Sequence, residues 1–235
     1  MKIAGKGIPF LLTIWMIVLI QAFAYAQPYR IRVDSLKVDS KIYYGANSAQ
    51  LKGPIVSVAG KNAPAIYRDA MANYVCDGVD DQVQITAAMD YISTNFNGGG
   101  TVFLIGDSFF VDQDTLSYCI FFDSTKHRAI SIKGEGKYTT TIKIEGGANA
   151  TAFGIYKTSR VSLSDFTIDG NDANNTAGGG IYPIASEEIS LTNIHIDSVQ
   201  AHAVSVLSSK HVYIGNVTAD FSTAGHGIDI DRSTH

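Results

Sequence analysis

Residues Cys76–Val111 read CDGVDDQVQITAAMDYISTNFNGGGTVFLIGDSFFV, and this stretch decides the fold. After an Asp-rich start, apolar residues recur at helical spacing: Ile85, Ala88, Met89 and Ile92. Asp81 lies three residues before Gln84, an arrangement like a capping box, whose side chains satisfy free N–H groups at a helix start. The glycines Gly98–Gly100 end the helix, and Thr101–Ile105 begins a β-rich region. We therefore expect a helix that caps the first coil of a β-solenoid.

The chain becomes repetitive after Ile130. Three segments that begin at Gly154, Gly180 and Ala203 align with one another, and a fourth opens at Gly227, so the repeats recur at a nearly constant spacing. Each repeat is expected to supply three short strands whose apolar residues alternate inward. The first strands place Ile155, Ile181, Val204 and Ile228 inside, with Tyr156, Tyr182, Ser205 and Asp229 together in one outward column. Stacked coils bury an apolar face that a single coil would leave exposed.

Two polar columns mark the ends of strands in these repeats. The turn between the second and third strands holds Asp165, Asn193 and Asn216, and the third strand ends at Asp169, Asp197 and Asp220. Asp and Asn tolerate the left-handed backbone conformation and bond to nearby turn backbone, so the first column predicts a repeated tight turn.

A leucine-rich repeat is the competing fold. Leu163 to Asn171 fits the template L-x-x-L-x-L-x-x-N, but Val199 and Ser222 stand at the Asn position of the next two repeats. Each repeat also carries further β-branched segments where that fold needs a helix or turn. The pattern therefore favours the β-solenoid.

The order of these motifs also resembles a known family. The motifs are YVCDGVDDQVQITAAMDYI, then GGGTVFL, ISIKGEG, TIKI and FTIDGNDANN. From about Tyr74 to His235 the chain resembles the N-terminal part of pectate-lyase-like proteins, which have the pectin lyase fold. The resemblance implies an all-β protein: a right-handed parallel β-helix with three strands per coil and an N-terminal capping α-helix. It also implies a protein that binds a polysaccharide or acts on it as a lyase, hydrolase or epimerase; a non-catalytic surface, adhesion or tailspike-like module is the alternative.

The chain departs from two catalytic signatures of that family. Polygalacturonases carry Asn-Thr-Asp-Gly-Ile-Asp, whereas this chain has Ala224-Gly-His-Gly-Ile-Asp229, so that His226 replaces the catalytic Asp. Alginate epimerases carry Asp-Pro-His-Glu where this chain has Ala203-Val-Ser-Val-Leu207. Neither signature is complete, so the resemblance leaves the activity open.

The candidate catalytic residues are His226, Asp229 and Asp231, because two carboxylates two apart on a strand share its outward face. Arg232, Tyr156 and Tyr182 are the candidate substrate-binding residues, since aromatic faces pack on the C–H surface of sugars. The alternatives are a solvated outer face for the acids and a cross-strand aromatic ladder for the tyrosines. The carboxylate pair has the ligand type that Ca²⁺ prefers, but no motif supports a calcium site, so we predict no metal and no cofactor.

The N-terminus predicts export. Lys2 and Lys6 precede an apolar run and Ala24-Tyr-Ala26, which is typical of a signal peptide over residues 1–26; a membrane anchor is the alternative. We expect an N-terminal extension with short strands and a helix over 27–73, and a β-helix domain over 74–235 that is truncated at its C-terminus. The predicted location is secreted or at the cell surface.

The net charge of the chain limits the kinds of partner that it is expected to bind. Without residues 1–26 the chain has 16 Lys and Arg (18 less Lys2 and Lys6) against 22 Asp and Glu, a net charge of −6. This argues against nucleic acid, which needs basic surfaces, and leaves an extracellular polysaccharide as the expected partner. No membrane span is expected once the signal peptide is removed, and the oligomeric state is open. Cys76 and Cys119 could form a disulfide or stay as buried thiols.

Overall fold

The computed structural model describes residues 53–114, 116–222 and 224–231. Their elements, in chain order, are β1 Ile55–Ala59, η1 Tyr67–Met71, β2 Tyr74–Val75, α2 Gln82–Asn95, β3 Gly100–Ile105, β4 Ser108–Val111, β5 Tyr118–Phe122, β6 Ile130–Lys133, β7 Thr141–Ile144, β8 Thr151–Tyr156, β9 Ser162–Asp169, β10 Ile181–Ile184, β11 Glu187–Val199, β12 Val204–Leu207, β13 Lys210–Ser222 and β14 Ile228–Asp231. The described part is therefore mostly β-strand.

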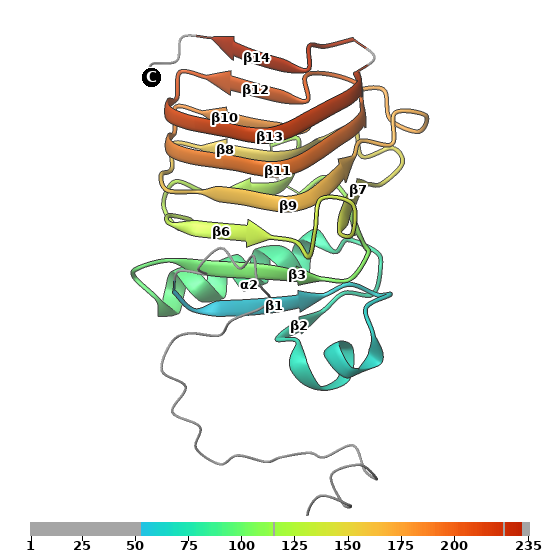
Figure 1. Ribbon diagram of the computed structural model, residues 1–235, viewed down its shortest axis with the longest axis vertical. Helices are drawn as coiled ribbons and strands as arrows, with labels where there is room; N and C mark the ends of the chain where they lie inside the picture. The colour runs from blue at the N-terminus through green and yellow to red at the C-terminus, as the bar shows by residue number, and fades with distance from the viewer. Residues whose placement is uncertain (1–52, 115, 223, 232–235) are drawn as a thin grey trace, which may run out of the picture. The chain divides into compact units, whose positions relative to one another are not determined.

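The strands pair in parallel and form two sheets. One sheet has the order β13-β11-β9-β6-β3-β1-β2, with β4 and β7 beside this path, and the other has the order β14-β12-β10-β8-β5. Figure 1 shows β6, β9, β11 and β13 stacked one above another. This pairing is consistent with a β-helix-like solenoid. The larger sheet begins with β1, upstream of Tyr74, and the predicted division into domains stays a prediction.

The predicted second and third strands of each repeat are joined into single bent strands, β9, β11 and β13. The bends lie at Asp165, Asn193 and Asn216, whose φ angles are 63°, 54° and 53°. Asn193 Nδ2 donates to Asp165 Oδ1 at 2.7 Å, and Asn216 Nδ2 donates to Asn193 Oδ1 at 2.8 Å. The predicted polar column is confirmed, and it is a continuous hydrogen-bonded ladder at the left-handed positions that Asn and Asp tolerate.

The register of these strands agrees with the predicted repeats. Phe166 pairs with Ile194, which pairs with Val217, and the end column aligns Asp169, Asp197 and Asp220. Among the described residues from Thr141 to Asp231, strands and turns follow one another without a helix. The leucine-rich repeat is therefore wrong as an alternative.

The inner faces of the two sheets pack against each other. The rings of Phe153 on β8 and Phe166 on β9 have centroids 5.6 Å apart, and both side chains are fully buried. Apolar side chains of both sheets and of α2 form one continuous core. Burial of apolar surface contributes about 25 cal/mol per Å², so this shared core is the main source of stability.

The α2 helix contributes its predicted apolar face to that core. The four residues of that face, Ile85, Ala88, Met89 and Ile92, are fully buried, and the helix contacts β1 to β6. The expected capping box is wrong, because the Asp81 side chain makes no bond to the helix start. Its carboxylate instead accepts the N–H groups of Gly78 at 3.0 Å and Phe110 at 2.8 Å, which ties the acidic stretch to β4.

Both cysteines are buried, free thiols. Burial raises the pKa of Cys119 to about 12, and burial together with the neighbouring Asp81 carboxylate raises the pKa of Cys76. A thiol with a raised pKa is a poor nucleophile at neutral pH, so both residues have a packing role. The predicted signal peptide over 1–26 lies outside the described residues, and within these no helix is long and apolar enough to cross a membrane.

Candidate functional site

The outer face of the five-stranded sheet carries most of the residues that the sequence singles out. One column crosses the sheet in register: Phe121 pairs with Gly154, Gly154 with Tyr182, Tyr182 lies beside Ser205, and Ser205 pairs with Asp229. Adjacent strands lie about 4.8 Å apart, so this column extends over about 19 Å. It joins an aromatic end to an acidic end.

The expected pairing of Tyr156 with Tyr182 is wrong by two residues. Tyr182 pairs with Gly154, and Tyr156 pairs with Ile184, which places it in the column that ends at Asp231. The ring of Tyr118 explains why the position beside Tyr182 is a glycine. A Cβ atom at Gly154 would lie 2.5 Å from Cγ of Tyr118, so any side chain there would displace that ring.

Three aromatic rings stack at the N-terminal end of this face, and we call Tyr118, Phe121 and Tyr156 the aromatic cluster. The ring centroids of Tyr118 and Phe121 are 5.6 Å apart with the planes 21° apart, and those of Phe121 and Tyr156 are 6.5 Å apart at 26°. The Nζ atom of Lys157 lies 4.8 Å from the centroid of the Tyr156 ring. All three aromatic side chains remain accessible to solvent. Sequence reasoning missed Tyr118 and Phe121, which precede the first recognisable repeat.

Tyr182 connects the aromatic cluster to two histidines. Burial raises the pKa of the Tyr182 hydroxyl; a hydrogen bond from the backbone N–H of His202 opposes the shift, and the nearby Tyr118 and Asp229 add to it. The backbone N–H of His226 donates to Nδ1 of His202 at 3.0 Å, and the two imidazole rings have centroids 5.4 Å apart. Because Nδ1 of His202 is an acceptor, its neutral ring carries the proton on Nε2.

The acid pair lies on β14 at the other end of the face. Asp229 is half-buried and Asp231 is exposed, and the alternation along the strand directs both carboxylates away from the core side. Tyr182 and Asp229 are two strands apart, about 10 Å between backbones. The structure therefore places Tyr182 and Asp229 in one column, His226 beside His202, and Asp231 in the adjacent column. Arg232 lies outside the described residues, and the assigned roles stay predictions.

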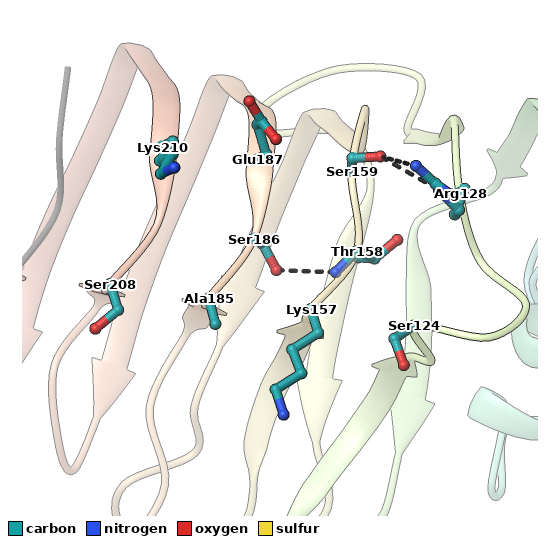
Figure 2. Close-up of a pocket in the computed structure, with 10 residues that line it drawn as sticks. All are labelled: Ser124, Arg128, Lys157, Thr158, Ser159, Ala185, Ser186, Glu187, Ser208 and Lys210. Atoms are coloured by element: carbon teal, nitrogen blue, oxygen red, sulfur yellow. Dashed lines mark hydrogen bonds between the residues drawn. The ribbon is translucent and has the colours of Figure 1, made fainter.

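A polar groove of about 340 Å³ lies where the chain turns from the five-stranded sheet into the nine-stranded one. We call it the corner groove; besides serine and threonine side chains, its lining contains Arg128, Lys157, Glu187 and Lys210. Figure 2 shows Lys157 and Glu187 extending in opposite directions from neighbouring turns. The groove adjoins the aromatic cluster through Lys157 and adjoins β14 through Ser208, whose N–H donates to the carbonyl of Asp231 at 2.9 Å.

A buried histidine fixes the loop that follows β5. His127, whose side chain is 4% exposed, accepts the N–H of Asp123 on Nδ1 at 3.1 Å and contacts Asp90 of α2 through Nε2 at 3.0 Å. Both ring nitrogens are occupied, so this pair joins α2 to the loop and leaves no nitrogen for chemistry. In the parts of the chain that the structure describes, no group of three or more His, Cys, Asp or Glu side chains could hold a metal ion.

The described residues thus define a class: parallel strands stacked in two sheets, with aromatic, histidine and acidic side chains on one outer face. Comparison of the structure with solved proteins finds a predicted glycosyl hydrolase from Parabacteroides merdae ATCC 43184, with 13% identity and a TM-score of 0.51 over 66% of this chain and 76% of that one. At this identity the likeness concerns the fold alone.

Two further structures are similar to this chain. They are the A-modules of the mannuronan C-5 epimerases AlgE4 and AlgE6 from Azotobacter vinelandii, with identities of 18% and 19% and TM-scores of 0.47 and 0.39. The matches cover 67% and 64% of this chain and 51% and 55% of those modules. No protein-family model matches the sequence, and no curated protein is a match.

Proposed function

We propose that this chain is an exported polysaccharide-binding protein whose β-strands form a right-handed parallel β-helix, closed at its N-terminal end by α2. The stacked rings of Tyr118, Phe121 and Tyr156 carry the proposal. All three side chains are accessible to solvent, and accessible aromatic surface packs well on the C–H surface of sugar rings. A chain of sugars would lie across the strands, from the aromatic cluster toward Asp229.

Polysaccharide processing would take place at the acidic end of the same face. Tyr182, His226 and Asp229 combine a phenol, an imidazole and a carboxylate, the side chains that most often move protons in lyase, hydrolase and epimerase reactions. Asp231, two residues beyond Asp229, supplies a second carboxylate for chemistry that needs an acid and a base. The Parabacteroides neighbour's assignment as a glycosyl hydrolase makes hydrolysis the first of these activities to test.

Binding is tested with the chain without its predicted signal peptide, residues 1–26, which we call the exported form. It is run through native gels that contain acidic or neutral polysaccharides, where binding retards migration. Phe121→Ala removes the central ring of the stack and should weaken binding about twofold to tenfold, since an aromatic contact contributes about 0.5 to 1.5 kcal/mol beyond its area. Tyr138→Ala is the matched control, because it removes a 75% exposed ring outside the five-stranded sheet. Equal retardation of all three proteins would contradict the proposal.

Turnover is measured on the polysaccharides that bind, as reducing ends for hydrolysis and as unsaturated products for lyase action. Asp229→Asn should abolish any turnover and leave binding within about twofold, because the aromatic cluster lies at the other end of the face. The second candidate is a non-catalytic surface module, which the presence of His226 at the position of the polygalacturonase Asp favours. Binding without turnover would select this second candidate.

A further inference from the structure

The corner groove is positively charged in a chain that is negatively charged as a whole. Its lining contains three cationic side chains, Arg128, Lys157 and Lys210, and one carboxylate, Glu187, whereas the full chain has a net charge of −4. The Oε1 atom of Glu187 lies 3.5 Å from Nδ1 of His211, so its charge is directed toward a group that is cationic when protonated. The local charge therefore favours an anionic ligand.

Stacked turns build the groove. Lys157, Ala185 and Ser208 all have left-handed backbone conformations, with φ of 48°, 50° and 50°, and each donates its N–H to the neighbouring coil. The next residues in two of these turns, Thr158 and Ser186, are buried and linked, because the Thr158 N–H donates to Ser186 Oγ at 3.3 Å (Figure 2). The floor is thus fixed by hydrogen bonds, while the charged side chains stand at the rim.

The arrangement of the cations indicates which anions fit. Arg128 directs both Nε and Nη2 at Ser159 Oγ, at 3.4 and 3.2 Å (Figure 2). That edge is one of the two through which a guanidinium binds an oxyanion with two parallel bonds, and here it is engaged by Ser159. Lys157 and Lys210 are point charges that impose no planar geometry. These lysines and the hydroxyl groups of the lining serines Ser124, Ser159 and Ser208 come from several turns, which suits an oxyanion whose oxygens point in tetrahedral directions.

Lys157 links this groove to the aromatic cluster. Its Nζ atom lies over the Tyr156 ring at 4.8 Å, and Tyr156 stacks on Phe121. A charged substituent on a sugar that packs against those rings would therefore reach Lys157 without a change of the fold.

We propose that the corner groove binds a sulfate or phosphate ester on a sugar whose ring packs on the aromatic cluster. This inference rests on the proposed polysaccharide binding and adds the substituent that the protein selects. Both esters are tetrahedral oxyanions. They differ in charge, because a phosphate monoester gains its second negative charge near pH 6 and a sulfate ester keeps one charge throughout.

The test compares one oligosaccharide in sulfated, phosphorylated and unsubstituted form by isothermal titration calorimetry on the exported chain. Both esters should bind at least about tenfold more tightly than the unsubstituted sugar at low salt, and the preference should shrink as salt screens the charges. Lys157→Gln and Lys210→Gln should each weaken ester binding about threefold, as expected for exposed charge pairs. Lys210→Gln, which is not in contact with the aromatic cluster, should leave the unsubstituted sugar unchanged. Glu187→Gln should strengthen ester binding about threefold, because it removes the opposing charge.

Lys61→Gln is the control, since it removes an exposed positive charge in the turn after β1. The affinity for the phosphate ester should rise between pH 5 and pH 7 as its second charge forms, and the affinity for the sulfate ester should stay constant. The ester that binds more tightly at pH 7 is the one that the groove prefers. Equal binding of all three sugars, still sensitive to Phe121→Ala, overturns this inference and leaves the proposed function intact. Failure of every sugar to bind overturns both.

Discussion

The ladder at Asp165, Asn193 and Asn216 gives a stability prediction that can be worked from the structure. Asn193→Ala removes two hydrogen bonds: the bond it donates to the Asp165 carboxylate at 2.7 Å and the bond it accepts from Asn216 at 2.8 Å. It also places an alanine at a φ of 54°, where alanine costs about 1 kcal/mol or more. The first bond is charge-assisted and partly buried, and contributes about 1 kcal/mol; the second is exposed and contributes about 0.5 kcal/mol. The expected loss is about 2.5 kcal/mol.

Asn216→Ala is the matched comparison. Its φ of 53° makes the backbone cost the same, but it loses only the bond that Asn216 donates to Asn193. We expect a loss of about 1.5 kcal/mol, so the difference between the two variants isolates the bond to Asp165. Urea unfolding followed by circular dichroism measures both, provided that the m-values agree. If Asn193→Ala is no more destabilising than Asn216→Ala, the ladder does not stabilise the stack as argued.

Three further predictions concern the pH dependence, the core and the outer face. Burial opposes the ionisation of Asp165, but the bonds from Lys133 and Asn193 outweigh it and lower the pKa of this carboxyl. Its contribution to stability is therefore present above the unfolded-state pKa of about 3.9 and is lost as pH falls through the lower folded-state pKa, so Asp165→Asn should flatten acid unfolding below about pH 4. Phe166→Ala should cost about 3 to 5 kcal/mol in urea unfolding, because the ring is fully buried against Phe153. Gly154→Ala should displace the Tyr118 ring and weaken polysaccharide binding, whereas Gly215→Ala, which crowds the hydroxyl of Tyr213 instead, should not; an equal effect of both would remove Tyr118 from the binding face.

The sequence was sufficient to predict the stack of parallel strands, because the same pattern of strands and turns recurs in each repeat. Alternating apolar residues give the strands, and Asp165, Asn193 and Asn216 mark a turn that only a few residue types adopt readily. The role of Asp81 could not be read in the same way. Its spacing to Gln84 fits a capping box, but its carboxylate accepts a hydrogen bond from the N–H of Phe110, which lies 29 residues later in the chain. Local spacing carries no information about such a distant partner.

The aromatic cluster was missed for a related reason. Tyr118 and Phe121 lie on β5, before the first repeat that can be recognised, and they meet Tyr156 only because β5 pairs with β8. The signal in the sequence is the pair of aromatic residues three apart, which gains meaning once that pairing is known. The candidate acids, in contrast, stand out in the sequence because Asp229 and Asp231 alternate with isoleucines.

The two-residue error at Tyr156 shows how the register of stacked parallel strands should be derived from a repetitive sequence. Gly154-Ile-Tyr and Gly180-Ile-Tyr look alike and align by their letters, and a slip of two positions leaves every inward residue inward, so the apolar pattern cannot detect it. The polar columns can detect such a slip, because their members must lie side by side. The offset from Asp165 to Asn193 equals the offset from Thr158 to Ser186 in the corner groove, and both pairs are joined by a hydrogen bond. Applied to the first strand, the same offset pairs Gly154 with Tyr182, as the structure does. The number of residues between paired positions is therefore the same for every strand of one repeat, and the hydrogen bonds between neighbouring turns reveal it. This number places Tyr182 in the same column as Phe121 and Asp229.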